Sequence, residues 1–292
     1  MAGIEFVIVS PVGDVVPLAS GVNDPGDFRL MTGVVGFGAP GVDVNARDSA
    51  GGGLIVRNFR VQARSFNLPV GIDAVDRFDM ADKQRRLEAA THAQPGLPYP
   101  RLRATYATGR VLELPFYVTS GFEETYTETG ERWTVFDLTA TAPKPYWRDT
   151  ETRDFAITPP LEGVPLLTNL ATIPLTAGAP SGELTVTNPG DVAVPLEWEA
   201  VGPFTRAEIT VGGDRFVIGA LTSAEAVIIR ASQAGGFTVQ DGSGGDAYSK
   251  IGPAPRFPSM PAGVRQVRAT VTGQASGSRI TGRFRPAYRS VF

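Results

Sequence analysis

The segment Arg132–Asp149, RWTVFDLTATAPKPYWRD, decides how the rest of the chain is divided. From Phe136 to Thr141 apolar and polar residues alternate, which is typical of a strand that buries one face. Pro143 and Pro145 lack a backbone N–H and restrict φ, so the strand must end before them. We therefore expect this segment to be the last strand of a first domain, followed by the exit from that domain.

This reading divides the chain into a domain over residues 1–150 and a second domain over residues 151–292, entered by a proline-rich linker near residues 151–182. Aromatic residues directly after the two prolines can fix an angle between domains by burying area. The predicted interdomain hinge consists of Pro143, Pro145, Tyr146 and Trp147.

Composition excludes several kinds of site. The chain has 292 residues, of which 42% are hydrophobic and 20% charged, as in globular proteins with a buried core. No run of about 18 apolar residues occurs, so we expect no membrane insertion. Cysteine is absent and His92 is the only histidine, which excludes disulfides and cysteine nucleophiles and leaves one residue for any triad or histidine metal site. We expect no catalytic residue, no metal and no cofactor.

Short strands are predicted at the start of the chain, with a hairpin formed by Ile4–Ser10 and Val15–Leu18. The glycine-rich stretch GVVGFGAPGVDVNARDSAGGG, residues 33–53, indicates a long loop with a functional or subunit-contacting role. Leu54–Leu68 is the longest strand pattern in this half. Arg60 and Arg64 share one face of it, and we predict that they contact another subunit.

One helix is predicted, capped by Asp73 or Asp76 and ending at His92, that is, near residues 76–92. A hairpin formed by Arg101–Ala107 and Val111–Thr119 follows. A polar stretch then carries four carboxylates that a glycosidase could use, although a solvated loop without an apolar frame is the favoured interpretation. These carboxylates are Glu123, Glu124, Glu128 and Glu131.

The second half reads as a β-sandwich or jelly roll, because short strands separated by turn signals recur there without a helix signal. The predicted strands are Glu183–Asn188, Val194–Ala200, Ala207–Val211, Arg215–Ile218, Ala226–Arg230, Phe237–Gln240, Val264–Val271 and Ile280–Arg285. Residues 265–292 contain six arginines and no acidic residue. We expect two of them, Arg283 and Arg285, to meet acidic surface on the same or a neighbouring subunit.

Three stretches resemble the distal tail proteins of long-tailed siphophages. They are the Leu54–Leu68 strand with a helix ending in QRRLEAATHA, the pivot TATAPKPYWRD, and FPSMPAGVRQVRATVTG near residue 265. The resemblance extends over nearly the whole chain. It implies a mainly β protein, with an N-terminal β-sandwich or barrel-like ring domain bearing one α-helix and a C-terminal galectin-like or jelly-roll β-sandwich.

The resemblance also implies a function without catalysis: a virion protein at the tail tip that forms a homo-hexameric ring between tail tube and tip or baseplate. The implied partners are further copies of the chain, the tail tube protein, the tail-tip hub or tail-associated protein, the tape measure protein and receptor-binding proteins. Nucleic acid would only pass through the lumen. The alternative is a carbohydrate-binding module whose C-terminal sandwich contacts host-wall glycans through Trp198, Phe237 or Tyr248.

Overall fold

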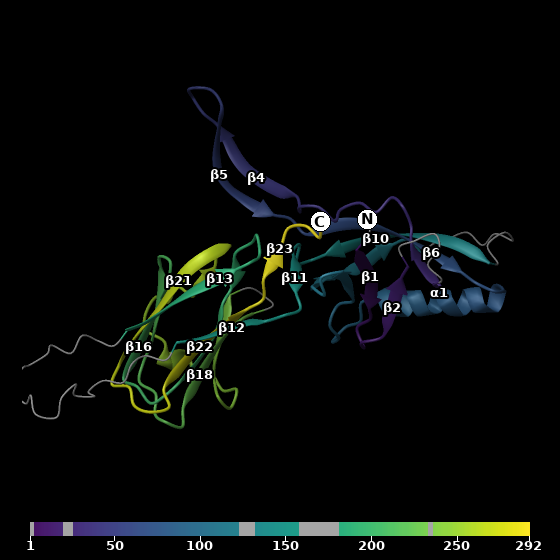
Figure 1. The fold of residues 1–292 in the computed structure, drawn as a ribbon. Coiled ribbons are helices and arrows are strands. Elements are labelled where there is room, and N and C mark those ends of the chain that lie inside the picture. Colours follow the sequence, from purple (N-terminus) through teal and green to yellow (C-terminus); the bar gives the residue numbers. More distant parts are fainter. Residues whose placement is uncertain (1–2, 20–25, 123–131, 158–180, 233–235) are drawn as a thin grey trace, which may run out of the picture. The chain divides into compact units, whose positions relative to one another are not determined.

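The computed structural model describes residues 3–19, 26–122, 132–157, 181–232 and 236–292 (Figure 1). The chain divides into two compact units, one comprising residues 1–150 and 288–292, the other residues 151–287. Antiparallel sheets build both units, and the described residues contain one α-helix. The prediction of a mainly β protein is therefore confirmed.

The first unit contains a six-stranded and a four-stranded sheet. The six-stranded sheet has the order β2 (Val15–Leu18), β1 (Ile4–Val9), β7 (Arg101–Tyr106), β8 (Val111–Pro115), β11 (Trp147–Asp149) and β23 (Ala287–Tyr288). The four-stranded sheet has the order β3 (Phe28–Leu30), β6 (Arg64–Asp73), β10 (Trp133–Ala142) and β9 (Tyr117–Ser120). Both predicted hairpins, β1–β2 and β7–β8, are present, but the predicted strand Val111–Thr119 is wrong in its extent, because β8 ends at Pro115 and β9 continues in the other sheet.

A single apolar cluster joins the inner faces of these two sheets. In β10 the predicted alternation is confirmed, since Phe136, Leu138 and Ala140 are buried. The same cluster takes in Leu68 of β6 and Leu102 of β7, so side chains of both sheets share one core. The burial of one face of each sheet is what stabilises the unit.

The helix α1 (Arg77–Thr91) begins where the sequence predicts. The side chain of Asp76 accepts hydrogen bonds from the backbone N–H groups of Phe78 and Asp79, each at 2.9 Å. At the other end, the backbone N–H of His92 donates to the carbonyl of Glu88. Within the described ranges, no helix has the length and apolar character that crossing a membrane requires.

Two sequence-based expectations about residues 33–68 are wrong. The stretch from Leu54 to Leu68 is not one strand but two, because two residues separate β5 (Leu54–Val61) from β6, which belongs to a different sheet. The glycine-rich stretch before it is not all loop, since it contains β4 (Val42–Asp48), which pairs with β5. Polar and glycine residues lower strand propensity, but β4 gains its hydrogen bonds from a neighbouring strand.

The second unit is a β-sandwich. Its five-stranded sheet has the order β12 (Arg153–Ile157), β22 (Arg279–Phe284), β15 (Glu197–Val201), β18 (Ala226–Ala231) and β19 (Phe237–Asp241). Its four-stranded sheet has the order β13 (Ser181–Asn188), β21 (Gly263–Thr272), β16 (Arg206–Val211) and β17 (Asp214–Ile218), and β14 (Val194–Pro195) pairs with β20 (Ser259–Met260). Trp198 of β15 contacts Phe216 of β17, with ring centroids 5.7 Å apart, so the two sheets share a core.

The packing around Gly282 generates a prediction. Gly282 of β22 lies opposite Trp198, and a Cβ at this position would lie 2.2 Å from Cζ of Phe155. We expect Gly282→Ala to lower the free energy of unfolding of the second unit by about 1–3 kcal/mol, because the core must shift to admit the methyl group. Urea denaturation followed by tryptophan fluorescence measures this change.

The matched control is Gly213→Ala. No heavy atom lies within 4 Å of a Cβ at Gly213, and its backbone is not left-handed. Equal urea midpoints for the two variants would contradict the tight packing at Gly282.

Candidate functional site

The strands β4 and β5 form a two-stranded hairpin, here called the arm, which is visible in Figure 1. Among the described strands, β4 and β5 pair only with each other. Nearly every residue of the arm is exposed; only Ala46 and Val61 are half-buried. An isolated two-stranded hairpin is marginally stable in water, so the arm requires an explanation beyond its own hydrogen bonds.

A β-bulge in the arm determines which side chains share a face. Val44 lies opposite Phe59 and Asn45 opposite Asn58, but Ala46 then lies opposite Val56, so Arg57 is the additional residue. Without this extra residue the alternation along β5 would place Val56 on the opposite face from Phe59. With the bulge, both side chains lie on the face that carries Val44.

The arm is therefore amphipathic. Its apolar face contains Val42, Val44, Ala46, Leu54, Val56, Phe59 and Val61, and it ends next to the turn at Asp48, which lies opposite Leu54. Its polar face contains Asp43, Asn45, Arg47, Ile55, Asn58 and Arg60. The side chains of the apolar face stand in solvent: Phe59 is 73% exposed, Leu54 is 68% exposed and Val44 is 58% exposed.

This apolar face can bind another apolar surface. Burial of one large apolar side chain stabilises an association by roughly 1.5–3 kcal/mol before the costs of binding. Contiguous exposed apolar surface on a soluble protein marks a contact site more often than a random surface does. The arrangement therefore suits contact with another apolar surface.

The four arginines predicted as subunit contacts have different environments. Arg60 is exposed on the polar face of the arm, opposite Asp43, and its role in subunit contact stays a prediction. The expectation for Arg64 is wrong, because its side chain is 2% exposed and inside the first unit. The sequence pattern, read as one continuous strand, places Arg64 on the same face as Arg60. The break after β5 instead turns the side chain of Arg64 inward.

Arg283 and Arg285 have partners within the second unit. Nη2 of Arg283 lies 3.7 Å from Oε2 of Glu199, and Nε of Arg285 donates to Oγ1 of Thr152 at 3.3 Å. Arg283 thus faces an acidic group of its own unit. Contact of either residue with a neighbouring subunit stays a prediction.

Of the predicted hinge residues, Pro143, Pro145 and Tyr146 lie between β10 and β11, and Trp147 is the first residue of β11. Trp147 is fully buried in the first unit, where its ring is 5.6 Å from that of Phe37 in an edge-to-face arrangement. Pro143 is exposed, while Pro145 and Tyr146 are half-buried. Trp147 is therefore a core residue of the first unit, and the hinge function of the four residues stays a prediction.

The residues predicted to contact glycans do not form a platform. Trp198 is 2% exposed and packs against Phe155 at 5.6 Å, so the expectation that it stacks on a sugar is wrong. Phe237 is half-buried against Phe257, with ring centroids 4.9 Å apart. Tyr248 is 47% exposed, but its hydroxyl donates to the carbonyl of Phe237.

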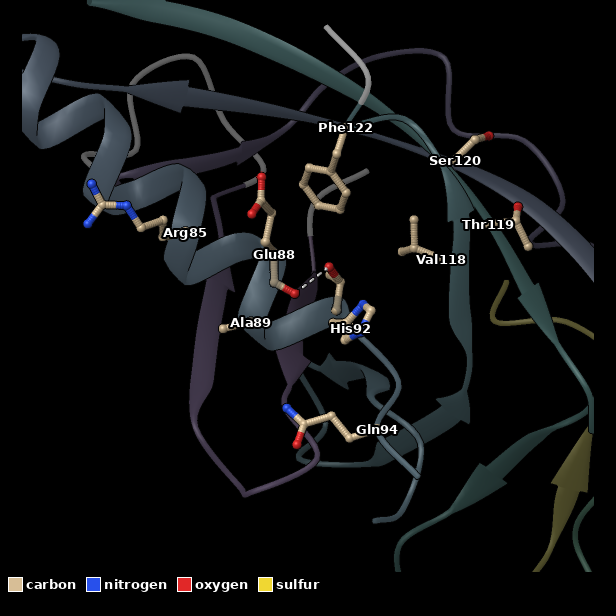
Figure 2. A pocket seen from close by; sticks show the side chains of 10 residues that line it. Arg85, Glu88, Ala89, His92, Gln94, Val118, Thr119, Ser120 and Phe122 are labelled. Carbon is tan, nitrogen blue, oxygen red and sulfur yellow. Dashed lines mark hydrogen bonds between the residues drawn. The ribbon is translucent and has the colours of Figure 1, made fainter. Parts of the chain in front are cut away.

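A cavity of about 460 Å³ lies beside the end of α1. Figure 2 shows the side chains that line it. Glu88 and His92 come from the helical side, and Val118 and Phe122 come from β9 and the residues after it. Glu88 is engaged, since its Oε1 accepts a hydrogen bond from Gln84 at 3.1 Å. The four predicted glycosidase carboxylates, residues 123, 124, 128 and 131, lie outside the described residues.

A second cavity, of about 310 Å³, lies in the second unit. Its carboxylates hold loops in place. Asp241 accepts hydrogen bonds from Ser243 and Gly245, and Glu225 accepts from Lys250 Nζ at 2.8 Å and from the backbone N–H of Thr222 at 2.7 Å. The described part of the chain contains no cluster of three or more residues able to hold a metal ion.

Comparison with solved structures identifies the fold. The chain is similar to the Dit (gp 19.1) protein of phage SPP1, described as a paradigm of the hub adsorption apparatus in phages that infect Gram-positive bacteria. The TM-score is 0.64 at 10% identity, and the match covers 97% of this chain and 98% of the SPP1 protein. A chain of the phage P2 baseplate in its activated conformation with Ca has a TM-score of 0.50 at 9% identity, with 99% of each chain covered.

Sequence comparison adds nothing to this likeness, because no family model and no curated protein matches the chain. The structural match covers both units, so both parts of the Dit fold are present here. The fold class expected from the sequence is thereby confirmed.

The loop contact at Glu225 generates a prediction. The hydrogen bond from Lys250, together with those from Thr222, lowers the pKa of Glu225 to about 2. Because the folded pKa lies below the ordinary value for glutamate, the contact stabilises the loop at neutral pH. This stabilisation is lost as the pH falls from about 4.5 towards 2.

An NMR titration of the Glu225 carboxyl carbon measures that pKa. In Lys250→Met we expect the midpoint to rise towards the ordinary glutamate value, because the hydrogen bond from Lys250 is the largest cause of the lowered pKa. An unchanged Glu225 midpoint would show that Lys250 does not cause the shift.

Proposed function

We propose that the protein is a structural virion component without enzymatic activity, located at the distal end of a long non-contractile phage tail. It forms a ring, with six subunits as the expected number, that joins the tail tube to the tail tip or baseplate. The ring offers a docking platform for host-recognition proteins. Its partners are further copies of the chain, the tail tube protein, the tail-tip hub or tail-associated protein, the tape measure protein and receptor-binding proteins.

One observation carries this proposal: the arm presents a continuous apolar face to solvent in the isolated chain. A face of this kind requires a covering surface, and a second copy of the chain provides one in every subunit of an assembly. When each subunit gives an arm and receives another, the contact is heterologous and closes into a ring if the rotation permits. The fold shared with the SPP1 hub protein supports the same assignment.

A carbohydrate-binding function has weaker support. A sugar platform needs an exposed aromatic face with convergent polar groups, and Trp198 is buried. Tyr248 keeps an exposed ring, but the carboxylates of the nearby cavity are engaged in hydrogen bonds within the loops. We therefore do not adopt the alternative.

Assembly generates the test. We expect Phe59→Lys to abolish ring formation, because a charge at the centre of the apolar face cannot be buried without a partner. Phe59 is largely exposed in the single chain, so the variant should keep the stability of the wild type. Sedimentation velocity and negative-stain electron microscopy of purified protein measure the ring, and urea denaturation measures the stability.

The control is Asn58→Lys, which adds the same charge on the polar face of the same strand. It should leave ring formation intact. The proposal fails if the wild type remains monomeric at high concentration, or if both lysine variants form rings equally well.

A further inference from the structure

Arg64 holds both ends of the arm. It lies three residues after the end of β5, and Nη1 of its guanidinium donates to the carbonyls of Gly36 and Gly38, which precede β4. The distance to the Gly36 oxygen is 2.8 Å. The segment before β4 and the segment after β5 are therefore connected through the side chain of Arg64.

Two further carbonyls complete the surroundings of the guanidinium. Nε donates to Pro145 at 2.8 Å, and Nη2 donates to Arg289 at 2.6 Å. These acceptors come from the joint between β10 and β11 and from the segment Tyr288–Phe292, here called the return segment. Two of the hydrogen bonds of the guanidinium thus hold the entry to the arm, and the other two connect it with distant parts of the sequence.

The buried charge makes these contacts obligatory. Burial lowers the pKa of Arg64 to about 10, so the guanidinium stays protonated at neutral pH. A buried cation that loses a hydrogen-bond acceptor keeps its desolvation cost without compensation. Loss of one carbonyl therefore destabilises the arrangement of the other three.

Gly36 shows how closely the arm approaches the sheet. Its φ is +91°, and a Cβ would lie 2.5 Å from the carbonyl oxygen of Ser65. Only glycine fits both constraints. The entry to the arm is consequently a defined structure and not a free tether.

The return segment packs against the same entry. Val291 is fully buried, its N–H donates to the carbonyl of Phe37 at 3.5 Å, and its carbonyl accepts from the hydroxyl of Tyr106. The guanidinium of Arg110 stacks on the ring of Tyr288 at 3.8 Å. Phe37 connects these contacts to the core through Trp147.

We infer that Arg64 is the positioning residue of the arm and that the return segment supplies a required part of its site. Residues that follow the second unit in the sequence thereby set the orientation of the surface used for assembly. The effect on ring formation rests on the proposed function, whereas the effect on the arm can be measured in the single chain.

Amide hydrogen exchange of the full chain at low concentration tests the inference. Val291→Asp places a charge in the buried seat of the return segment. We expect the amides of Val35, Gln62 and Asn67, which are hydrogen-bonded at the base of the arm, to exchange about tenfold faster or more. Val264→Asp is the matched control, because Val264 is 57% exposed in the second unit, and it should leave these amides unchanged.

The guanidinium itself is tested by Arg64→Gln with Arg60→Gln as control. The first should accelerate the same three amides, and the second should not. Tyr106→Phe removes a single hydrogen bond to the return segment, so it should give a smaller acceleration without threatening the fold.

The inference is overturned if Val291→Asp leaves the three amides as protected as in the wild type. If Val291→Asp also unfolds β10, the result for Tyr106→Phe is used in its place. Unchanged exchange of the three amides in Tyr106→Phe then overturns the inference. A wild-type chain that forms no ring contradicts the proposed function alone, because the exchange result does not depend on assembly.

Discussion

The guanidinium of Arg64 is charged, buried and surrounded by main-chain carbonyls from three separate parts of the chain. Such a group imposes a geometric constraint, because each N–H needs an acceptor once water has been excluded. Through these hydrogen bonds Arg64 fixes the position of the residues before β4, of Pro145 after β10 and of residues 288–292. Apolar burial between the two sheets provides the stability of the unit, but it does not by itself specify where the arm leaves them.

Most of the architecture follows from local patterns in the sequence. The alternation in β10, the cap at Asp76 and the hairpin turn at Gly109 all depend on neighbouring residues, and all are predicted. The arm is missed because its apolar pattern changes phase at Arg57, where a bulge adds a residue. Two apolar alternations that are one residue out of phase, Leu54 and Val56 before Arg57 and Phe59 and Val61 after it, are the signal that could reveal it. The burial of Arg64 depends on carbonyls up to 225 residues away, which no local pattern contains.

Several polar groups of the described cavities make hydrogen bonds within the protein. Asp241 bonds to Ser243 and Gly245 of its own loop, Glu225 bonds to Thr222 and Lys250, and Glu88 bonds to a residue on its own helix. A catalytic site keeps at least one such group available for a substrate. Among the described residues, the arm exposes several large apolar side chains on one face, including Phe59, Leu54 and Val44.

The return of residues 288–292 to the first unit also sets an order of events during synthesis. The ribosome makes the first 150 residues, then the 137 residues of Glu151–Ala287, and only then the segment that occupies the seat beside Phe37. At 5–20 residues per second, this interval lasts roughly 7–27 s. During this interval the position that Val291 occupies beside Phe37 is empty, and the guanidinium of Arg64 lacks its acceptor on Arg289. A chaperone that binds exposed apolar segments therefore has a defined time window on this chain.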